Sequence, residues 1–289
     1  MITTFFDIVI AGLLMGGIYA LIAVGLSLQY GVARVLNISH GEFIMIGAFG
    51  TWLLFKTTGM NPLITIAICG PVLFLIGFLL HKTLFKRLLN ASESMNVFES
   101  KSMLATFGIL FIIQNIALLI WGADVKGYSY LNYGISLGGA VFAANRLLTL
   151  LCAVIIGTAF YLFLARTRMG KAIRAAAQDP KTAGLMGVNI DQVLALCFGF
   201  GALMAGFAGG LLSMCYPITA TMGMEYTIIA IIVVVLGGLG SIVGSFIGGF
   251  FLGIIGSFVT YIEPGLALVA YYVIFILLLL ARPTGILGK

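Results

Sequence analysis

Long, almost uncharged apolar segments follow one another along nearly the whole chain, and they constrain its fold more than any other feature. Most run for about 16 to 25 residues, which a helix rising 1.5 Å per residue needs to cross a hydrocarbon core of about 30 Å. Charged residues make up 8% of the chain, against roughly 25% in a soluble domain. The sequence therefore predicts an all-α integral membrane protein.

Nine candidate spans can be placed by hydropathy. They are Phe5–Tyr30, His40–Lys56, Pro62–His81, Ser102–Trp121, Leu147–Ala165, Gln192–Cys215, Tyr226–Leu239, Ser241–Ile262 and Leu266–Ala281. The second and seventh are short, as broken or re-entrant helices are. We therefore predict a polytopic bundle of eight or nine transmembrane helices, forming one domain over residues 1–289. The first apolar stretch is too long for a signal peptide and is interpreted as an uncleaved span.

The distribution of basic residues predicts the orientation, because cytoplasmic segments are enriched in Lys and Arg. With the N-terminus outside and the C-terminus cytoplasmic, three of the 15 basic residues lie outside: Lys56, Lys126 and Arg146. The other twelve lie inside: Arg34, Lys82, Lys86, Arg87, Lys101, Arg166, Arg168, Lys171, Arg174, Lys181, Arg282 and Lys289. The net charge of +6 mostly reflects this bias, so it indicates no nucleic-acid partner.

Small residues recur at helical spacing in several spans, for example at Gly12 and Gly16. Such rows let helix backbones approach closely, within the subunit or between subunits. The predicted packing glycines are Gly237, Gly238, Gly240, Gly244 and Gly248. The four cysteines are widely spaced in apolar surroundings, which favours packing over a disulfide or a metal site.

The segment RMGKAIRAAAQDPKTAGLMGVNI, residues 168–190, differs from its apolar surroundings. It predicts two short helices with a sharp bend, because Asp179 can cap a second helix that starts at Pro180 and ends at Gly187. The charge bias places this segment in the cytoplasm. It is either a solvated loop near lipid headgroups or a docking element for a cytoplasmic partner, with Ala175, Ala176, Ala177 and Ala183 supplying a surface of small side chains.

Polar residues gather just before and inside the second span, at Asn37, Ser39, His40, Gly41 and Glu42. Polar groups at membrane depth are costly and usually face a cavity or a partner, so one interpretation places these residues on a translocation path. Helix capping is the alternative, because Asn and Ser are good N-caps and an acid is favourable in a first turn.

Three stretches together resemble the permease subunits of branched-chain amino-acid importers of the ATP-binding-cassette class. They are LNISHGEFIMIGAF (36–49), the segment 168–190, and VLGGLGSIVGSFIGG (235–249). They occur in the expected order, and the resemblance covers nearly the whole length. Val243 stands where the resemblance leads us to expect proline, which affects a kink and not the assignment.

The resemblance implies a multi-pass protein of a bacterial or archaeal inner membrane that forms half of a pore. The segment of about 166–191 would couple to the ATPases through Arg168, Gly170, Ala175, Ala176, Ala177, Asp179, Pro180, Ala183 and Gly187. The implied partners are two cytoplasmic ATPase subunits, a second related permease, an extracytoplasmic binding protein and the lipid bilayer. No cofactor is expected on this chain, because the sequence lacks a phosphate-binding G-x-x-x-x-G-K-[ST] motif; ATP and Mg²⁺ would bind the partner subunits.

Two other functions agree less well with the sequence. A stand-alone secondary transporter would need ionisable residues inside its spans for ion coupling, and the spans are nearly free of them. An intramembrane enzyme would need a catalytic constellation, and the two histidines, His40 and His81, are far apart with no paired acids. Branched-chain or other small neutral amino acids are the expected substrates, with urea or short amides as the alternative.

Overall fold

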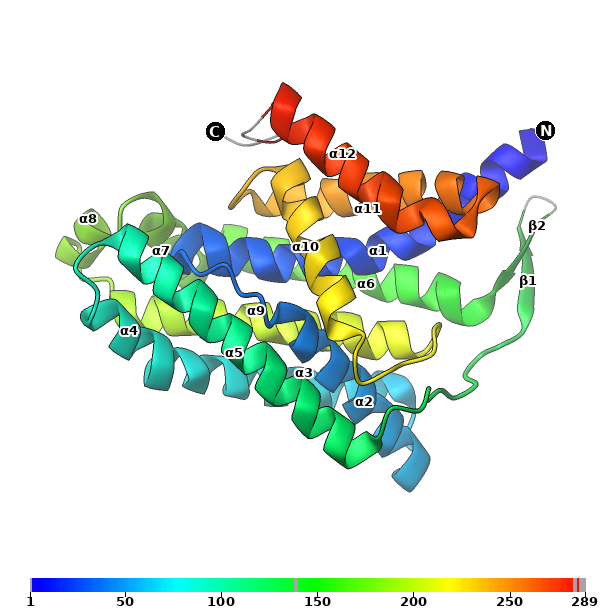
Figure 1. Ribbon diagram of the computed structural model, residues 1–289, viewed down its shortest axis with the longest axis horizontal. Helices are drawn as coiled ribbons and strands as arrows, with labels where there is room; N and C mark the ends of the chain where they lie inside the picture. Colours follow the sequence, from blue (N-terminus) through cyan, green and yellow to red (C-terminus); the bar gives the residue numbers. More distant parts are fainter. Residues whose placement is uncertain (1, 138–139, 283–284, 286–289) are drawn as a thin grey trace.

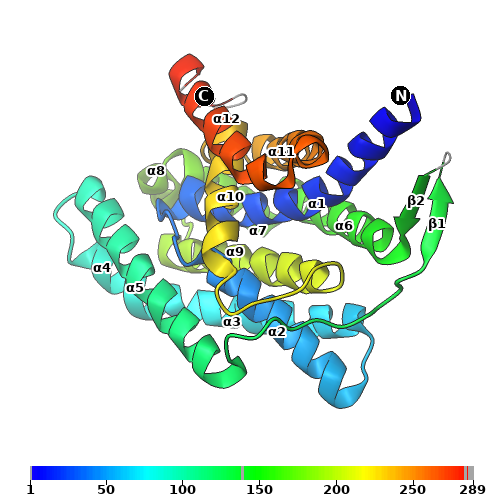
Figure 2. The same cartoon turned by 45° about the vertical axis from the view of Figure 1, so that its right-hand side comes forward.

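The computed structural model describes residues 2–137, 140–282 and 285, and it is almost entirely helical (Figures 1 and 2). The elements in chain order are α1 (Ile2–Ala33), α2 (His40–Thr58), α3 (Pro62–Leu80), the π-helix η1 (His81–Phe85), α4 (Lys86–Asn90), α5 (Met95–Trp121), β1 (Gly134–Leu137), β2 (Ala140–Ala143), α6 (Ala144–Arg166), α7 (Arg168–Gln178), α8 (Pro180–Leu185), α9 (Ile190–Ser213), α10 (Gly223–Gly237), α11 (Ile242–Ile262), the 3-10 helix η2 (Pro264–Leu266) and α12 (Ala267–Ala281).

Within the described ranges, seven helical segments are long and apolar enough to cross a membrane. They are Thr4–Ala33, Pro62–Asn90, Met95–Trp121, Ala144–Arg166, Ile190–Ser213, Ile242–Ile262 and Pro264–Ala281. All nine expected spans are helical, but α2 and α10 are not among the seven. The 19-residue α2 carries His40, Glu42 and Lys56, which lower its hydropathy. The apolar α10 has only 15 residues, or about 22 Å of helix.

The core of the molecule lies around α1 and α9. In the most apolar 18-residue stretch of each of these two helices, 72% and 78% of the residues are buried. Helix α1 packs against α11, α9 and α6, and α9 packs against α3 and α2. Glycines make the α1–α11 contact close: a Cβ on Gly12 would lie 2.5 Å from the Ile254 Cα, and one on Gly253 would lie 2.5 Å from the Gly12 carbonyl oxygen.

Two helices lie at the periphery, α5 and α12, with only 17% and 6% of their apolar windows buried. Their apolar side chains are therefore available to lipid or to another subunit. The chain between α5 and α6 contains a feature that the sequence analysis did not predict, an antiparallel hairpin in which Gly134 pairs with Ala143. The preceding loop is attached to the loop after α9 by two backbone hydrogen bonds between Lys126 and Ile218, of 2.9 and 2.8 Å.

Candidate functional site

The turn between α1 and α2 is held by a buried chain of hydrogen bonds that starts on α1. The Gln29 side chain donates to the Phe198 carbonyl of α9 at 3.1 Å and accepts from the Asn37 amide group at 3.2 Å. Asn37 in turn accepts from the backbone N–H and the hydroxyl of Ser39, at 3.1 and 2.7 Å. Asn37 thus forms a local turn before α2, while Ser39, the N-cap residue, makes no side-chain cap.

The first turn of α2 is joined to α10 and α1. The Gly41 N–H donates to the Thr227 hydroxyl at 2.8 Å, and this hydroxyl donates to the Ile38 carbonyl at 3.0 Å. The ring nitrogen Nε2 of His40 contacts the Ile22 carbonyl at 3.0 Å. A Cβ on Gly41 would lie 1.8 Å from the Gly223 carbonyl oxygen, so only glycine allows the two helices to cross here.

Glu42 is fully buried, and among the described residues its carboxylate has no hydrogen-bond partner. The carboxylate lies against Gly223, the first residue of α10, where a Cβ would come within 2.3 Å of Oε1. The unpaired N–H groups and the partial positive charge at a helix start favour an acid in this place. Glu42, which was expected to stabilise the first turn of α2, therefore also lies beside the first turn of α10.

The five residues expected on the translocation path are all buried, with the side chains of Asn37, Ser39, His40 and Glu42 0% exposed. In this structure they face other helices of the same chain, and their place on a translocation path stays a prediction. Sequence reasoning missed Gln29, Thr106 and Thr227, which complete the network. A polar residue inside an otherwise apolar span was the available signal.

The two short helices expected in the segment 168–190 are present as α7 and α8. Asp179 caps α8 by accepting from the backbone N–H groups of Lys181 and Thr182, at 2.9 and 3.3 Å. Hydrogen bonds from the side chain and backbone of Thr182 lower the pKa of Asp179 below its usual value. Gly187 follows α8 with a φ of 86°, the left-handed conformation expected of it.

Helix α7 is packed against the end of α6. A Cβ on Gly170 would lie 2.2 Å from the Leu164 carbonyl oxygen, so glycine is required at this contact. The Arg174 guanidinium donates to the carbonyls of Leu164 and Ala165 at the C-terminal end of α6, where a cation is favourable. Gly170 and Arg174 therefore fix the direction in which α7 leaves the membrane helix.

The alanines of this segment do not share one exposed surface, contrary to expectation. Ala176 and Ala183 are 1% and 5% exposed and pack inward with Ile173, whereas Ala177 is exposed and Ala175 is half-buried. An alanine carries too little hydrophobicity to indicate its facing from sequence. The most exposed apolar side chains of the segment are instead Leu185 and Met186, at 88% and 82%. We call these two residues the α8 tip.

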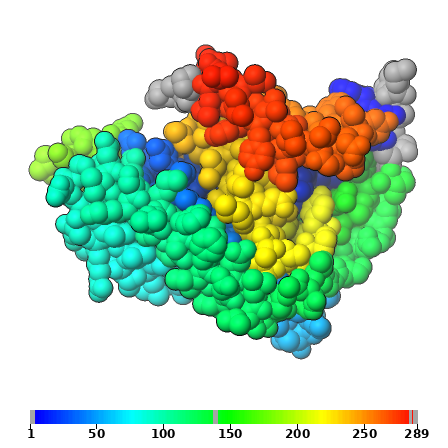
Figure 3. Space-filling view, in the orientation of Figure 1, coloured from blue at the N-terminus to red at the C-terminus, as the bar shows by residue number. Residues whose placement is uncertain are grey.

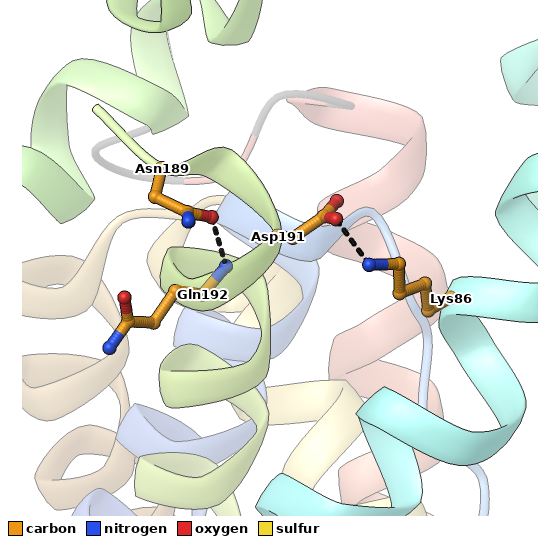
Figure 4. Close-up of polar contacts among 4 residues, drawn as sticks. All are labelled: Lys86, Asn189, Asp191 and Gln192. Carbon is orange, nitrogen blue, oxygen red and sulfur yellow. Dashed lines mark hydrogen bonds and ion pairs between the residues drawn. The ribbon is translucent and has the colours of Figure 1, made fainter. Parts of the chain in front are cut away.

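The start of α9 is fixed beside this segment, as Figure 4 shows. Asn189 accepts from the Gln192 backbone N–H at 3.0 Å and caps α9. Asp191 forms an ion pair with Lys86 of α4, with a distance of 2.6 Å between Nζ and Oδ2. Both side chains are about half exposed, so the pair adds little stability but orients α4 relative to α9.

The glycines of residues 237–248 lie where α10, α11 and α1 meet. A Cβ on Gly244 would lie 2.0 Å from the Gly237 carbonyl oxygen, and one on Gly248 would lie 3.1 Å from the Val233 carbonyl oxygen. Gly238 and Gly240 have φ values of 103° and 81°, and the Cβ of a residue replacing Gly240 would be 3.1 Å from the Gly31 Cα. These close approaches lie within the chain. Among the described residues, no three His, Cys, Asp or Glu side chains are grouped so as to hold a metal ion.

Comparison with known proteins identifies the class. The profile of the family described as branched-chain amino acid transport system / permease component matches residues 8–281. The chain is 32% identical to the high-affinity branched-chain amino acid transport system permease protein LivH of Escherichia coli, over 96% of this chain and 94% of that protein. It is 31% identical to the corresponding protein BraD of Pseudomonas aeruginosa, with the same coverage.

A solved structure supports the fold alone. The structure titled PsaBC from Streptococcus pneumoniae in complex with Fab matches with a TM-score of 0.54 at 12% identity, over 98% of this chain and 97% of that one. The helices and the profile define a multi-pass transport protein, the non-catalytic permease component of an ATP-binding-cassette system. The chain belongs to the family of branched-chain amino acid permease components, whose relatives are bacterial and archaeal membrane proteins.

Proposed function

We propose that the chain forms, as one transmembrane domain, half of an ATP-driven import pathway for branched-chain or other small neutral amino acids. A second, related permease would form the other half, two ATPase subunits would bind on the cytoplasmic side, and a binding protein would deliver the substrate outside. The substrate class rests on the relatives, which are described as high-affinity branched-chain amino acid permeases.

The proposed orientation has the N-terminus outside and both α7–α8 and the C-terminus in the cytoplasm. Helices α4, α7 and α8 lie at one end of the molecule, and the N-terminus and the β1–β2 hairpin lie at the other (Figures 1 and 2). The basic residues are concentrated at the first end, which supports a cytoplasmic location for it. Lys289, which was counted with the inner charges, lies outside the described residues.

The observation that carries the proposal is the α8 tip. Two neighbouring apolar side chains, Leu185 and Met186, are almost fully exposed on a short helix at the basic end of the molecule. The helix itself is held by its cap at Asp179 and by the inward packing of Ala183. An exposed apolar pair on a firmly held element is suited to insert into a pocket of a partner protein, which we identify with the ATPase.

The double substitution Leu185→Ser with Met186→Ser tests this docking. We expect the chain to reach the membrane normally, while co-purified ATPase and ATP-dependent leucine uptake fall about tenfold or more, because buried apolar anchors dominate protein interfaces. Val125→Ser is the matched control, since Val125 is also exposed, at 65%, but lies in the loop before β1. Wild-type co-purification and uptake in the double variant would overturn the docking role. Uptake driven by an ion gradient without the ATPases would instead favour a secondary transporter.

A further inference from the structure

A cavity of about 650 Å³ lies between α1, the start of α6, and α10, α11 and α12. In the space-filling view the surface is hollowed beneath α11 and α12, beside α10 (Figure 3). Its lining includes Thr4 of α1 and Phe142 of β2. The cavity therefore lies near the end of the molecule that carries the N-terminus and the β1–β2 hairpin. In the proposed orientation this is the extracytoplasmic side.

Three charged side chains of both signs line the cavity, each from a different helix: Asp7 of α1, Arg146 of α6 and Glu225 of α10. The ion pairs in the described part of the chain are Lys86–Asp191 and Lys126–Asp124, so none of the three lining charges is paired. Arg146 lies over the Tyr216 ring, 5.4 Å from its centroid, which places the guanidinium at the wall. Arg146 and Glu225 are exposed and Asp7 is partly buried, so all three charges are accessible to a solute in the cavity.

The rest of the lining is apolar and hydroxylic. Ile8, Met15 and Ile229 supply aliphatic surface. The hydroxyls of Tyr19 and Tyr271, 3.5 Å apart, supply groups that can donate or accept hydrogen bonds. A ligand that fits this lining has a negative group, a positive group and an aliphatic part.

We propose that this cavity binds the substrate directly, as a zwitterionic α-amino acid with an aliphatic side chain. Arg146 binds the carboxylate, because the planar guanidinium fork matches the two carboxylate oxygens. Glu225 and Asp7 bind the ammonium group, and the aliphatic lining receives the side chain. The inference rests on the proposed function and extends it by naming a site. It also distinguishes amino acids from urea and short amides, which carry no charges for these three residues to bind.

Photo-crosslinking tests the site without the binding protein. The probe is a diazirine analogue of leucine, added to the complete permease–ATPase complex in nanodiscs, and labelled peptides are identified by mass spectrometry. We expect labels on peptides that line the cavity, removed by excess leucine. Arg146→Gln should lower this labelling about tenfold, as the loss of a charge-assisted hydrogen bond does. Arg146→Lys should retain part of it.

Two controls separate carboxylate binding from general damage. Lys126→Gln removes another basic residue of the same side, one already paired with Asp124, and should leave the labelling unchanged. The carboxamide form of the probe lacks the negative charge. It should label the wild type much less than the amino acid does, and this preference should disappear in Arg146→Gln.

The outcomes distinguish a wrong site from a wrong function. The site alone is overturned if the wild-type complex with its binding protein takes up leucine in an ATP-dependent way but the probe labels residues elsewhere. It is also overturned if the labelling of the cavity is unchanged in Arg146→Gln. If Arg146→Gln raises only the concentration of binding protein that gives half-maximal uptake, Arg146 docks that protein and the site is likewise overturned. Absence of leucine uptake by the wild-type complex overturns the proposed function itself.

Discussion

Gly41 shows how a single missing side chain sets the position of a helix. A Cβ at this residue would lie 1.8 Å from the Gly223 carbonyl oxygen and 2.5 Å from the Thr227 hydroxyl. Gly41→Ala must therefore separate α2 from α10, and we expect a loss of about 1–3 kcal/mol of stability, as in other overpacked cores. Thermal unfolding of the purified complex measures it. Gly108→Ala is the control, because a Cβ at Gly108 of α5 would meet no atom within 4 Å. Equal melting temperatures for the two variants would contradict the prediction.

At the same scale, the sequence identified one half of the buried polar network. Asn37, Ser39 and Glu42 stand together and are conspicuous in an apolar chain. Asn37 bonds to Gln29 of α1, and the backbone of Ile38 and Gly41 bonds to Thr227 of α10, which is 186 residues along the chain from Gly41. Sequence shows that such groups are costly in a membrane but not which of them meet, because the meeting depends on helix packing. The contacts between these helices therefore could not be predicted from the sequence.

The α7–α8 element was predictable because its signals are local. A cap at Asp179, a proline at the first helical position and a left-handed glycine act within a few residues of each other. The hairpin of β1 and β2 also has a local signal, because two short β-prone runs are separated in the sequence by Gly138 and Gly139, but the sequence analysis did not use it. The facing of the alanines in α7 was harder to predict, because it depends on how Gly170 and Arg174 hold α7 against the end of α6.

The Asp179 cap leads to a prediction at the scale of this element. Asp179→Ala leaves the first N–H groups of α8 without their side-chain acceptor. We expect roughly fivefold faster amide hydrogen exchange in residues 180–186, measured by mass spectrometry on the complex, with the membrane helices unaffected. Asp179→Asn should exchange almost as the wild type, since asparagine caps as well as aspartate. Unchanged exchange in Asp179→Ala would mean that inward packing alone holds α8.

For the molecule as a whole, hydropathy predicted the helices but not their places in the bundle. The Pro264–Ala281 segment and the Thr4–Ala33 segment have mean hydropathies of 2.4 and 2.3, yet 6% of the first window is buried and 72% of the second. Lipid and protein interior are equally apolar, so a peripheral and a central helix have the same composition. The glycine rows were the better guide, because α1, which packs closely on α11, carries Gly12 and Gly16 at the contact.

The orientation of the whole chain supplies the last prediction. The charge bias predicts that the end with α7 and α8 lies inside and that the loop before β1 lies outside. Cysteines replacing Lys181, which is exposed, and Asp124, whose side chain is 85% exposed, report on the two ends. They are introduced after removal of Cys69, Cys152, Cys197 and Cys215, the four native thiols.

In intact cells an impermeant maleimide should label the cysteine at 124 and spare the one at 181, and inverted vesicles should give the opposite pattern. A cysteine replacing Arg168 at the exposed start of α7 is the matched control, and it should behave as the one at 181 does, because both lie in the same connection between α6 and α9. If the cysteines at 124 and 181 were labelled from the same side, both positions would lie on one side of the membrane and the proposed topology would be wrong. The α8 tip would then have no access to a cytoplasmic ATPase.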